Sequence, residues 1–392
     1  MKIARRARLL LAVTPLLAGC GDFWQAPSTT STTTTTTTTS LSSGYFYVIN
    51  QATSQIVAYD ITSGTLNQIA AYTLAAAPTA IAMSPGGGFL YVSTPVGIYL
   101  YAIGSNGGLT LGNNGGAVST DPASAIAIDP SGAWLVDAVQ GTSGVQLDAT
   151  PINSSGIYTG ATVGTEQYSL ANASVHHIAI SGDEHYIFVA AGEGGTLIVP
   201  FTVGDANPLA ANSSAIAPLI AGGSALSVAV DPGSAPRLLY VGETLASGGT
   251  TGGLRVYNYA SLGSATLTQV SGSPFSSGGL APNAILPVAA GDYVYVANGQ
   301  GTSTAGDITG FSVTASSGVY TVTNVSTVAS GIQPFGLAED SKSNFVLAVS
   351  EGGSYDLEAY IFDTTTAGQL DDSINSTTGT DPTDAIGVAA AP

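Results

Sequence analysis

The chain has 392 residues, of which 44% are hydrophobic and only 8% charged, and it contains 50 glycines. Four of its seven basic residues lie within the first eight positions; without them, three basic residues remain against 25 acidic ones, a net charge of −22. Such a surface repels phosphate backbones and anionic headgroups, which argues against nucleic acid as a partner. The glycines, together with many Thr, Ser and Val residues, favour strands and turns over helices.

The N-terminus has the pattern of an export signal. A basic stretch up to Arg8 precedes the apolar segment Leu9–Leu17, which is too short to span a bilayer. The ending Leu17-Ala18-Gly19-Cys20 resembles the lipobox of bacterial lipoproteins. The resemblance implies cleavage after residues 1–19 and a diacylglyceryl group on the Cys20 sulfur; an ordinary secreted protein is the alternative. Cys20 is the only cysteine, so no intramolecular disulfide can form.

Residues 20–43 begin at this cysteine and continue as a low-complexity segment. Thr32–Thr39 is an unbroken threonine run, and nothing around it alternates in a way that buries a face. We expect a disordered tether, on which O-linked sugars are the alternative to a bare chain. The chain is then expected to be a monomer in the bacterial cell envelope. Its lipid anchor alone would hold it to the membrane, facing the periplasm or the cell surface.

A repeat runs through the rest of the chain, residues 44–392. Its unit is a short apolar strand, a tight turn rich in Pro and Gly, and a second apolar strand, as in Pro78–Ser93. The first strands recur every 45 to 57 residues, which is the length of a four-stranded propeller blade. They are anchored at Ile81, Ile126, Ile178, Val228, Ile285, Leu337 and Ile386. The sequence therefore predicts an all-β fold, a seven-bladed β-propeller.

The strand pattern is offset at the two ends of this region. No first strand precedes Tyr45, whereas a surplus first strand, Ala385–Ala389, lies near the C-terminus. A propeller removes exposed strand edges only when its last blade meets its first. We therefore expect residues 383–390 to pair beside Tyr45–Asn50 and to close the ring within the first blade; an open solenoid is the alternative.

Two pieces of the repeat resemble YVTN-type units: Ile-Ala-Ile-Asp-Pro-Ser-Gly at 126–132 and Leu-Tyr-Val-Ser at 90–93. On these motifs, the whole of 44–392 is similar to the lactonase family of seven-bladed propellers. That family includes bacterial 6-phosphogluconolactonases and fungal carboxymuconate-cyclising enzymes. The resemblance implies the fold and, less specifically, lactone chemistry, because one fold hosts many functions.

The resemblance also indicates candidate catalytic residues. His176 and His177 open the first strand anchored at Ile178, as a His-His or Pro-His pair does in the family, and histidine is suited to proton transfer near neutral pH. Alternation along a strand predicts that only one of them faces the channel. In the next repeat the family has a Pro-Arg-His lead-in and a glutamate. Here the lead-in is Gly223–Leu226, the glutamate is Glu243, and Arg255 lies in the third strand.

Acidic residues in glycine-rich loops suggest a binding site for a cation. Glu193, Glu351 and Asp356 offer the oxygen atoms that Ca²⁺ prefers, but no EF-hand or nonapeptide motif accompanies them. No cofactor is predicted, while Ca²⁺ stays open and the metal ligands are unknown.

Two functions from different classes follow. The first is a non-catalytic propeller that binds a protein, glycan, small molecule or envelope component at the channel mouth, which the shortage of basic residues and the altered lead-in favour. The second is a lactonase that hydrolyses a sugar lactone with His176 or His177, Glu243 and Arg255. A lactone hydrolase needs a base and a group that stabilises the oxyanion.

Overall fold

The computed structural model describes residues 43–159, 163–232, 238–259, 267–301, 304–376 and 381–391. The export signal, Cys20 and the threonine run lie outside these ranges, and what the sequence predicts for them stays a prediction. Within the described ranges, no helix has the length and apolar character needed to cross a membrane.

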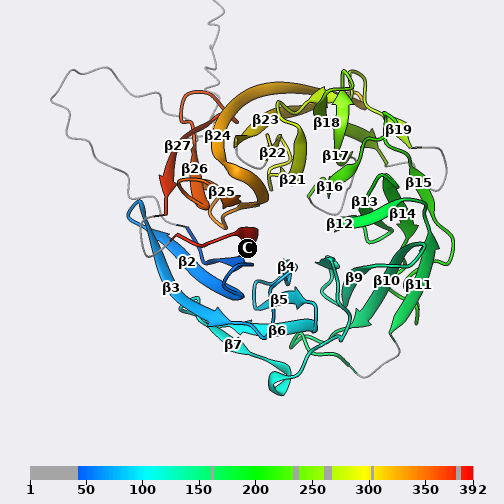
Figure 1. Cartoon of the computed structure of the whole chain (residues 1–392), viewed down its shortest axis with the longest axis vertical. Coiled ribbons are helices and arrows are strands. Elements are labelled where there is room, and N and C mark those ends of the chain that lie inside the picture. The colour runs from blue at the N-terminus through cyan, green and yellow to red at the C-terminus, as the bar shows by residue number, and fades with distance from the viewer. Residues whose placement is uncertain are drawn as a thin grey trace, which may run out of the picture. The chain divides into compact units, whose positions relative to one another are not determined.

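The described residues form a ring of antiparallel sheets around a central channel (Figure 1). Three of the blades are separate sheets, whereas blades 4 and 5 share one continuous sheet and blades 6 and 7 share another. The strands of each blade are given below with the innermost first. Blades 1 and 2 contain β28 (Ala385–Ala390), β1 (Phe46–Asn50), β2 (Gln55–Thr62) and β3 (Thr65–Thr73), then β4 (Ala80–Met83), β5 (Phe89–Thr94), β6 (Gly97–Ile103) and β7 (Leu109–Leu111). Blades 3 and 4 contain β8 (Ala125–Ile128), β9 (Trp134–Gln140), β10 (Gly144–Pro151) and β11 (Gly164–Ser169), then β12 (Ala173–Ile180), β13 (Tyr186–Gly192), β14 (Thr196–Pro200) and β15 (Ser214–Ile216).

The remaining three blades follow the same plan. Blade 5 contains β16 (Ala225–Val230), β17 (Leu238–Ser247), β18 (Thr251–Asn258) and the short β19 (Thr268–Gln269) and β20 (Phe275–Ser276). Blades 6 and 7 contain β21 (Ala281–Pro287), β22 (Tyr293–Gly299), β23 (Ala305–Ser316), β24 (Val319–Glu339), β25 (Phe345–Gly352), β26 (Leu357–Phe362) and β27 (Leu370–Asn375). The predicted all-β, seven-bladed propeller is confirmed.

One strand serves two blades. β24 is 21 residues long; its first part pairs with β23 at the rim of blade 6, and its last part pairs with β25 as the inner strand of blade 7. The register shifts between Pro334 and Gly336. The chain therefore passes from the rim of one blade to the channel of the next without leaving strand conformation.

The turn after the inner strand is fixed by glycine and by aspartate. In blade 3 the Gly132 N–H donates to the Asp129 carbonyl at 2.8 Å, and Gly132 has φ 72°, a conformation that glycine adopts without steric cost. In blade 7 the Asp340 carboxylate accepts the N–H groups of Asn344 and Phe345 at 2.7 and 2.6 Å. These turns hold the second strand in register beside the inner one.

The ring closes where the sequence predicts. β28 pairs antiparallel with β1, with Phe46 opposite Ala390 and Val48 opposite Val388 (Figure 1). All five residues of β1 are buried, so the strand depends on β28 on one edge and on β2 on the other. Closure by the C-terminal strand in the first blade is therefore confirmed.

The core lies in layers between neighbouring blades. One layer joins Phe46 and Val48 of blade 1 to Leu347 and Val349 of blade 7, and all four side chains are inaccessible to solvent. Because side chains alternate along a strand, each blade turns one face to the preceding blade and the other to the next. A polar side chain in such a layer is removed from water and needs a partner there.

Candidate functional site

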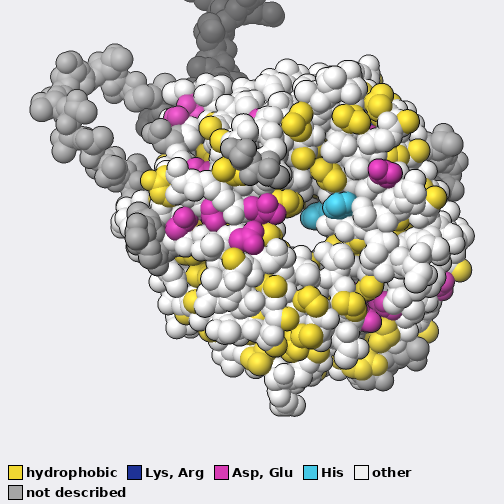
Figure 2. Space-filling view, in the orientation of Figure 1, with side chains coloured by type: hydrophobic (Ala, Val, Ile, Leu, Met, Phe, Trp, Pro, Cys, Tyr) yellow, Lys and Arg dark blue, Asp and Glu magenta, His cyan; other side chains and the backbone are white. Residues whose placement is uncertain are grey.

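The central channel holds a cavity of about 500 Å³. Its wall is formed mainly by the inner strands of the blades, with Gln51 after β1 and Glu351 in β25 at the mouth. The hollow is open in the space-filling view, where histidine side chains lie on one side of the mouth and a group of acidic side chains on another (Figure 2). The mouth therefore brings bases and acids from different blades around one solvent-filled space.

Both candidate histidines line this cavity. His176 and His177 lie in β12 and are exposed to the channel. The prediction that only one of them faces the channel stays a prediction, because four consecutive residues, Val175 to Ile178, line the cavity. The pairing of β12 with β13 shifts register between Ala173 and His177. Such an irregularity breaks the strict alternation of side chains. The sequence contains no signal for this shift.

His177 is held in one orientation by the neighbouring blade. Its Nδ1 lies 2.8 Å from the Val228 carbonyl oxygen in β16. A carbonyl only accepts, so Nδ1 carries the proton and Nε2 keeps its lone pair. The surrounding wall lowers the pKa of the His177 imidazole by disfavouring its charged form, and the bond to Val228 opposes this in part. The ring is therefore a neutral base at physiological pH.

His176 has a local partner instead. Its Nε2 lies 2.9 Å from the Ser174 hydroxyl, and burial lowers its pKa as well. The hydroxyl can donate or accept, so this contact leaves the tautomer open. Of the two histidines, His177 has the better defined base.

The acidic rim consists of Glu351, Asp356, Asp381 and Asp384. The Asp356 N–H donates to Asp381 at 2.9 Å, and the Asp384 N–H donates to Asp356 at 2.9 Å. Burial and the charges of Asp381 and Asp384 raise the pKa of Asp356 to about 6, although the bond from Asp384 opposes this. Burial and Asp384 likewise raise the pKa of Glu351. Negative charge thus concentrates at one side of the mouth.

Two amides complete the polar lining. Gln51 Nε2 donates to the Pro78 carbonyl at 3.3 Å, and Asn283 Nδ2 donates to the Pro334 carbonyl at 3.1 Å. Each amide nitrogen has a second hydrogen, which can serve a ligand. No Lys or Arg is among the described residues that line the cavity. The side-chain donors there besides histidine are therefore neutral groups, namely these amides and the hydroxyls of Thr79 and Ser124.

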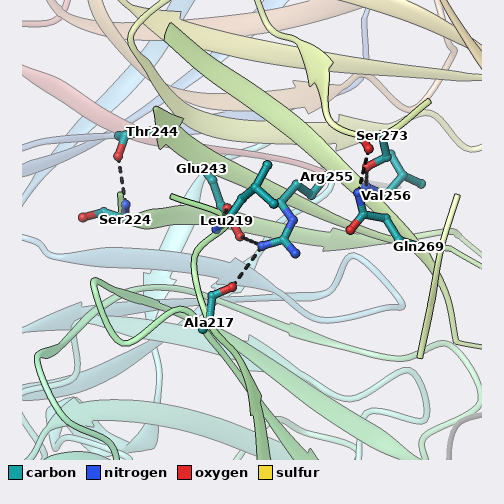
Figure 3. Close-up of polar contacts among 9 residues, drawn as sticks. All are labelled: Ala217, Leu219, Ser224, Glu243, Thr244, Arg255, Val256, Gln269 and Ser273. Atoms are coloured by element: carbon teal, nitrogen blue, oxygen red, sulfur yellow. Dashed lines mark hydrogen bonds and ion pairs between the residues drawn. The ribbon is translucent and has the colours of Figure 1, made fainter. Parts of the chain in front are cut away.

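Glu243 and Arg255 form a buried pair with each other (Figure 3). Arg255 Nη1 donates to Glu243 Oε1 at 2.6 Å and to the Ala217 carbonyl at 3.0 Å, and the Leu219 N–H donates to Glu243 Oε2 at 2.9 Å. The guanidinium lies 5.1 Å from the centre of the Tyr257 ring. Burial raises the pKa of Glu243, while Leu219 and Arg255 lower it. The pair is an internal contact of blade 5.

The structure thus divides the four candidate catalytic residues into two groups. His176 and His177 line the cavity, whereas Glu243 and Arg255 are 1% and 6% exposed and are not part of its lining. Gln51, Asn283 and the acidic rim were not predicted from the sequence to be part of this site. A usable signal existed for Asn283, because it lies two residues before the anchor Ile285 of its inner strand, as His176 lies two residues before Ile178.

The three residues considered for Ca²⁺ do not come together. Glu193 lies in the turn between β13 and β14 of blade 4, while Glu351 and Asp356 lie in and after β25 of blade 7. Among the described residues, the acidic group with metal-ligand spacing is a different one, Asp121, Asp137 and Asp148.

The fold and the channel define a seven-bladed propeller with a polar mouth, and the comparisons with known proteins agree. Residues 34–385 match the family model described as lactonase, 7-bladed beta-propeller. The chain belongs to this lactonase family. A search of curated proteins finds no match.

Solved structures of similar fold carry related names. The periplasmic gluconolactonase of Pseudomonas aeruginosa has a TM-score of 0.67 at 18% identity, over 90% of this chain and all of that one. Candidate 6-phosphogluconolactonases from Bacteroides uniformis and Bacteroides fragilis have TM-scores of 0.67 and 0.66, each at 16% identity. They cover 88% and 90% of this chain and 99% and 98% of their own. At such identities the likeness establishes the fold alone.

Proposed function

We propose that the chain hydrolyses an uncharged sugar lactone at the channel mouth, with His177 as the general base. The observation that carries the proposal is the His177 imidazole, whose Nδ1 is bonded to Val228 and whose Nε2 is left as an acceptor in the cavity lining. Membership of the lactonase family and structural neighbours named gluconolactonases support the reaction class. This reading replaces the non-catalytic binder as the preferred one.

The proposed reaction needs one base and one set of donors. His177 Nε2 takes a proton from water while the water oxygen attacks the lactone carbonyl, giving a tetrahedral oxyanion. The side-chain N–H groups of the lining, those of Gln51 and Asn283, are the candidate donors for that oxyanion. The C–O bond to the ring oxygen then breaks, the imidazolium returns its proton to that oxygen, and the product is a hydroxy acid.

The charge at the mouth bears on the substrate. The acidic rim lies beside the cavity, and no Lys or Arg is among its described lining residues. A phosphorylated sugar would meet negative charge there without a cationic partner, and phosphate recognition relies on such partners. We therefore expect an uncharged lactone to be preferred over its 6-phosphate.

A non-catalytic binder is the second candidate. It is favoured by the burial of Arg255 against Glu243, which removes the one described arginine from any role at the mouth. An acidic mouth with amide donors would also suit a glycan or a basic segment of an envelope protein. In that case the cavity would bind its ligand without chemical change.

The two candidates differ in an assay of lactone hydrolysis. The purified full chain is given glucono-δ-lactone and its 6-phosphate at pH 6.5, and acid release is followed above the spontaneous rate. We expect turnover of the uncharged lactone and a loss of about 10²-fold or more in His177→Ala, the usual range for removal of a general base. His185→Ala is the matched control, because His185 is exposed and pairs with Asp183 outside the cavity lining.

The pH profile gives a second readout. His177 must be neutral to accept a proton, and its pKa lies below the ordinary value of about 6.5. The enzymatic rate should therefore rise with pH through that lowered pKa and level off before neutrality. Turnover equal to the buffer rate for both lactones would refute the enzyme reading and leave ligand binding as the function of the mouth.

A further inference from the structure

Three aspartates from separate segments converge between blades 2 and 3. Asp121 precedes β8, Asp137 lies in β9, and Asp148 lies opposite Asp137 in β10. One carboxylate oxygen from each lies within 4.8 Å of the others. Their neighbours on the same face, Leu135 and Ile152, pack against residues of blade 2. The trio thus occupies an interblade layer, apart from the cavity of the channel.

Asp137 is the unusual member. Its side chain is 0% exposed, and neither of its carboxylate oxygens has a hydrogen-bond partner. A buried carboxylate without a partner is strongly disfavoured, because no water replaces the lost hydration. Burial, together with the charges of Asp148 and Asp121, raises the pKa of Asp137 well above its ordinary range. Two orphaned oxygens therefore lie beside two further acidic groups.

The other two aspartates are held in place by neighbours. The Asp148 carboxylate accepts hydrogen bonds from the side chains of Thr165 and Gln146. Asp121 accepts the Ser119 hydroxyl proton at 2.6 Å and is half-buried, so one side of the trio reaches solvent. These contacts fix two of the three carboxylates around Asp137, and Asp121 leaves a path by which a small ion can enter.

No described basic side chain balances this charge. Of the basic residues in the described ranges, Arg255 is paired with Glu243 in blade 5, and the Lys342 ammonium donates to the Ser43 carbonyl at 3.1 Å. The charges that influence Asp137 are those of Asp148 and Asp121, and both are acidic. Electroneutrality in this layer thus requires something other than these side chains.

We propose that Asp121, Asp137 and Asp148 bind a divalent cation of the hard, oxygen-preferring kind, with Ca²⁺ as its best match. All the donors are carboxylate oxygens, which suit Ca²⁺, Mg²⁺ and Mn²⁺ rather than zinc or copper. Three carboxylates offer up to six oxygens, in the range of the six to eight that Ca²⁺ takes in flexible geometry. Mg²⁺ is usually held by one or two carboxylates and keeps several waters. The cation would join the segment that leads into β8, through Asp121, to β9 and β10 of blade 3.

The test compares metal retention and thermal stability. The purified full chain is stripped with EDTA, dialysed against CaCl₂, MgCl₂ or MnCl₂, and analysed for bound metal and for its melting temperature. We expect one tightly held ion per chain, with Ca²⁺ preferred and raising the melting temperature by several degrees, because a ligand that binds only the folded state stabilises it. Asp137→Asn should lower Ca²⁺ affinity at least tenfold and remove the shift.

Two further variants locate the ion. Asp121→Asn, at a half-exposed position, should weaken Ca²⁺ binding without preventing folding, so the inference does not depend on the buried variant alone. Glu351→Gln in the acidic rim is the matched control and should retain the ion and the full shift. A wild-type protein that holds no ion and melts alike with or without all three salts would overturn the site. So would an Asp137→Asn variant that responds to Ca²⁺ as the wild type does.

Discussion

Blades 3 and 5 place different chemistry at the same structural position. In blade 3, Asp148 of β10 lies opposite Asp137 of β9; in blade 5, Arg255 of β18 lies opposite Val241 of β17. The two blades have the same register. Leu135 pairs with Ile128 at the end of β8, and Leu239 pairs with Val230 at the end of β16. Asp137 and Val241 each lie two residues after these leucines. Asp148 and Arg255 are therefore equivalent residues of two repeats.

The surroundings of these two residues match as well. Both face the preceding blade, and in both cases the segment that leads into the inner strand contributes a polar group. In blade 5 these groups are the Ala217 carbonyl and the Leu219 N–H; in blade 3 it is the Asp121 carboxylate. One repeat supplies its own countercharge and the other supplies a third acid.

The difference follows from composition. A chain that has three basic residues after position 8 and 25 acidic ones cannot neutralise every buried carboxylate with a side chain. Blade 5 uses one of those three for Glu243. Blade 3 must instead take up a proton or, as proposed above, a metal ion. At this position blade 5 neutralises its buried carboxylate with its own arginine. In blade 3 the charge depends on the pH and on the metal ions in solution.

The largest effect is expected from breaking the blade 5 pair. Arg255→Met leaves Glu243 buried without its cation, which should cost about 3–5 kcal/mol of unfolding free energy, measured by urea denaturation. The double variant Arg255→Met with Glu243→Met is the control. Because both charges are then gone, it should recover most of the loss. A single variant as stable as the wild type would show that the pair is not the main support of this layer.

An intermediate effect of opposite sign is expected in blade 3. In EDTA at pH 8, Asp137→Asn should raise the unfolding free energy by about 1–3 kcal/mol, the usual penalty of a buried polar group without a partner. The amide has no charge to desolvate and can donate to the neighbouring carboxylates. A metal-free variant less stable than the metal-free wild type would contradict the view that this carboxylate is strained by its neighbours.

The same variant has a predicted pH signature. The folded-state pKa of Asp137 is raised, so between its unfolded value of about 4 and the raised value the folded protein binds more protons than the unfolded one. The stability of the metal-free wild type should therefore fall as pH rises through this window. Asp137→Asn should remove that part of the slope in urea titrations at several pH values.

The smallest effect is expected at Asp121. It is half-buried and accepts one hydroxyl proton from Ser119, which an asparagine oxygen can also accept. Asp121→Asn should change metal-free stability by about 0.5 kcal/mol or less, as surface substitutions usually do. The stabilisation by Ca²⁺ should nevertheless weaken. If Asp121→Asn lowered the metal-free unfolding free energy as much as it lowered the stabilisation by Ca²⁺, Asp121 would have a structural role only.

The architecture could be predicted because it repeats. Anchors such as Ile81 and Ile126 recur at blade length, and the surplus strand at Ala385 indicates closure by the C-terminus. Each signal is local, a matter of strand pattern and turn residues. The structure adds β24, which continues through two blades and which no break in the pattern announces.

The candidate site was less predictable because its contacts join distant segments. The tautomer of His177 depends on Val228, which lies 51 residues away in the next blade. The register shift in β12, which ends at His177, has no sequence signature. The Asp137–Asp148 contact is a different case, because the two acids lie on neighbouring strands of one hairpin, whose register places them side by side.

Closure by β28 sets an order in which the fold can be completed. β1 is among the first strands to be synthesised, yet its inner edge pairs with residues 385–390. At about 5–20 residues per second, translation of the intervening chain takes on the order of tens of seconds. During that time the first blade has an open edge of the kind that invites pairing with other chains. Blade 1 is therefore begun first and finished last, and the chain needs protection at this edge until the C-terminal strand arrives.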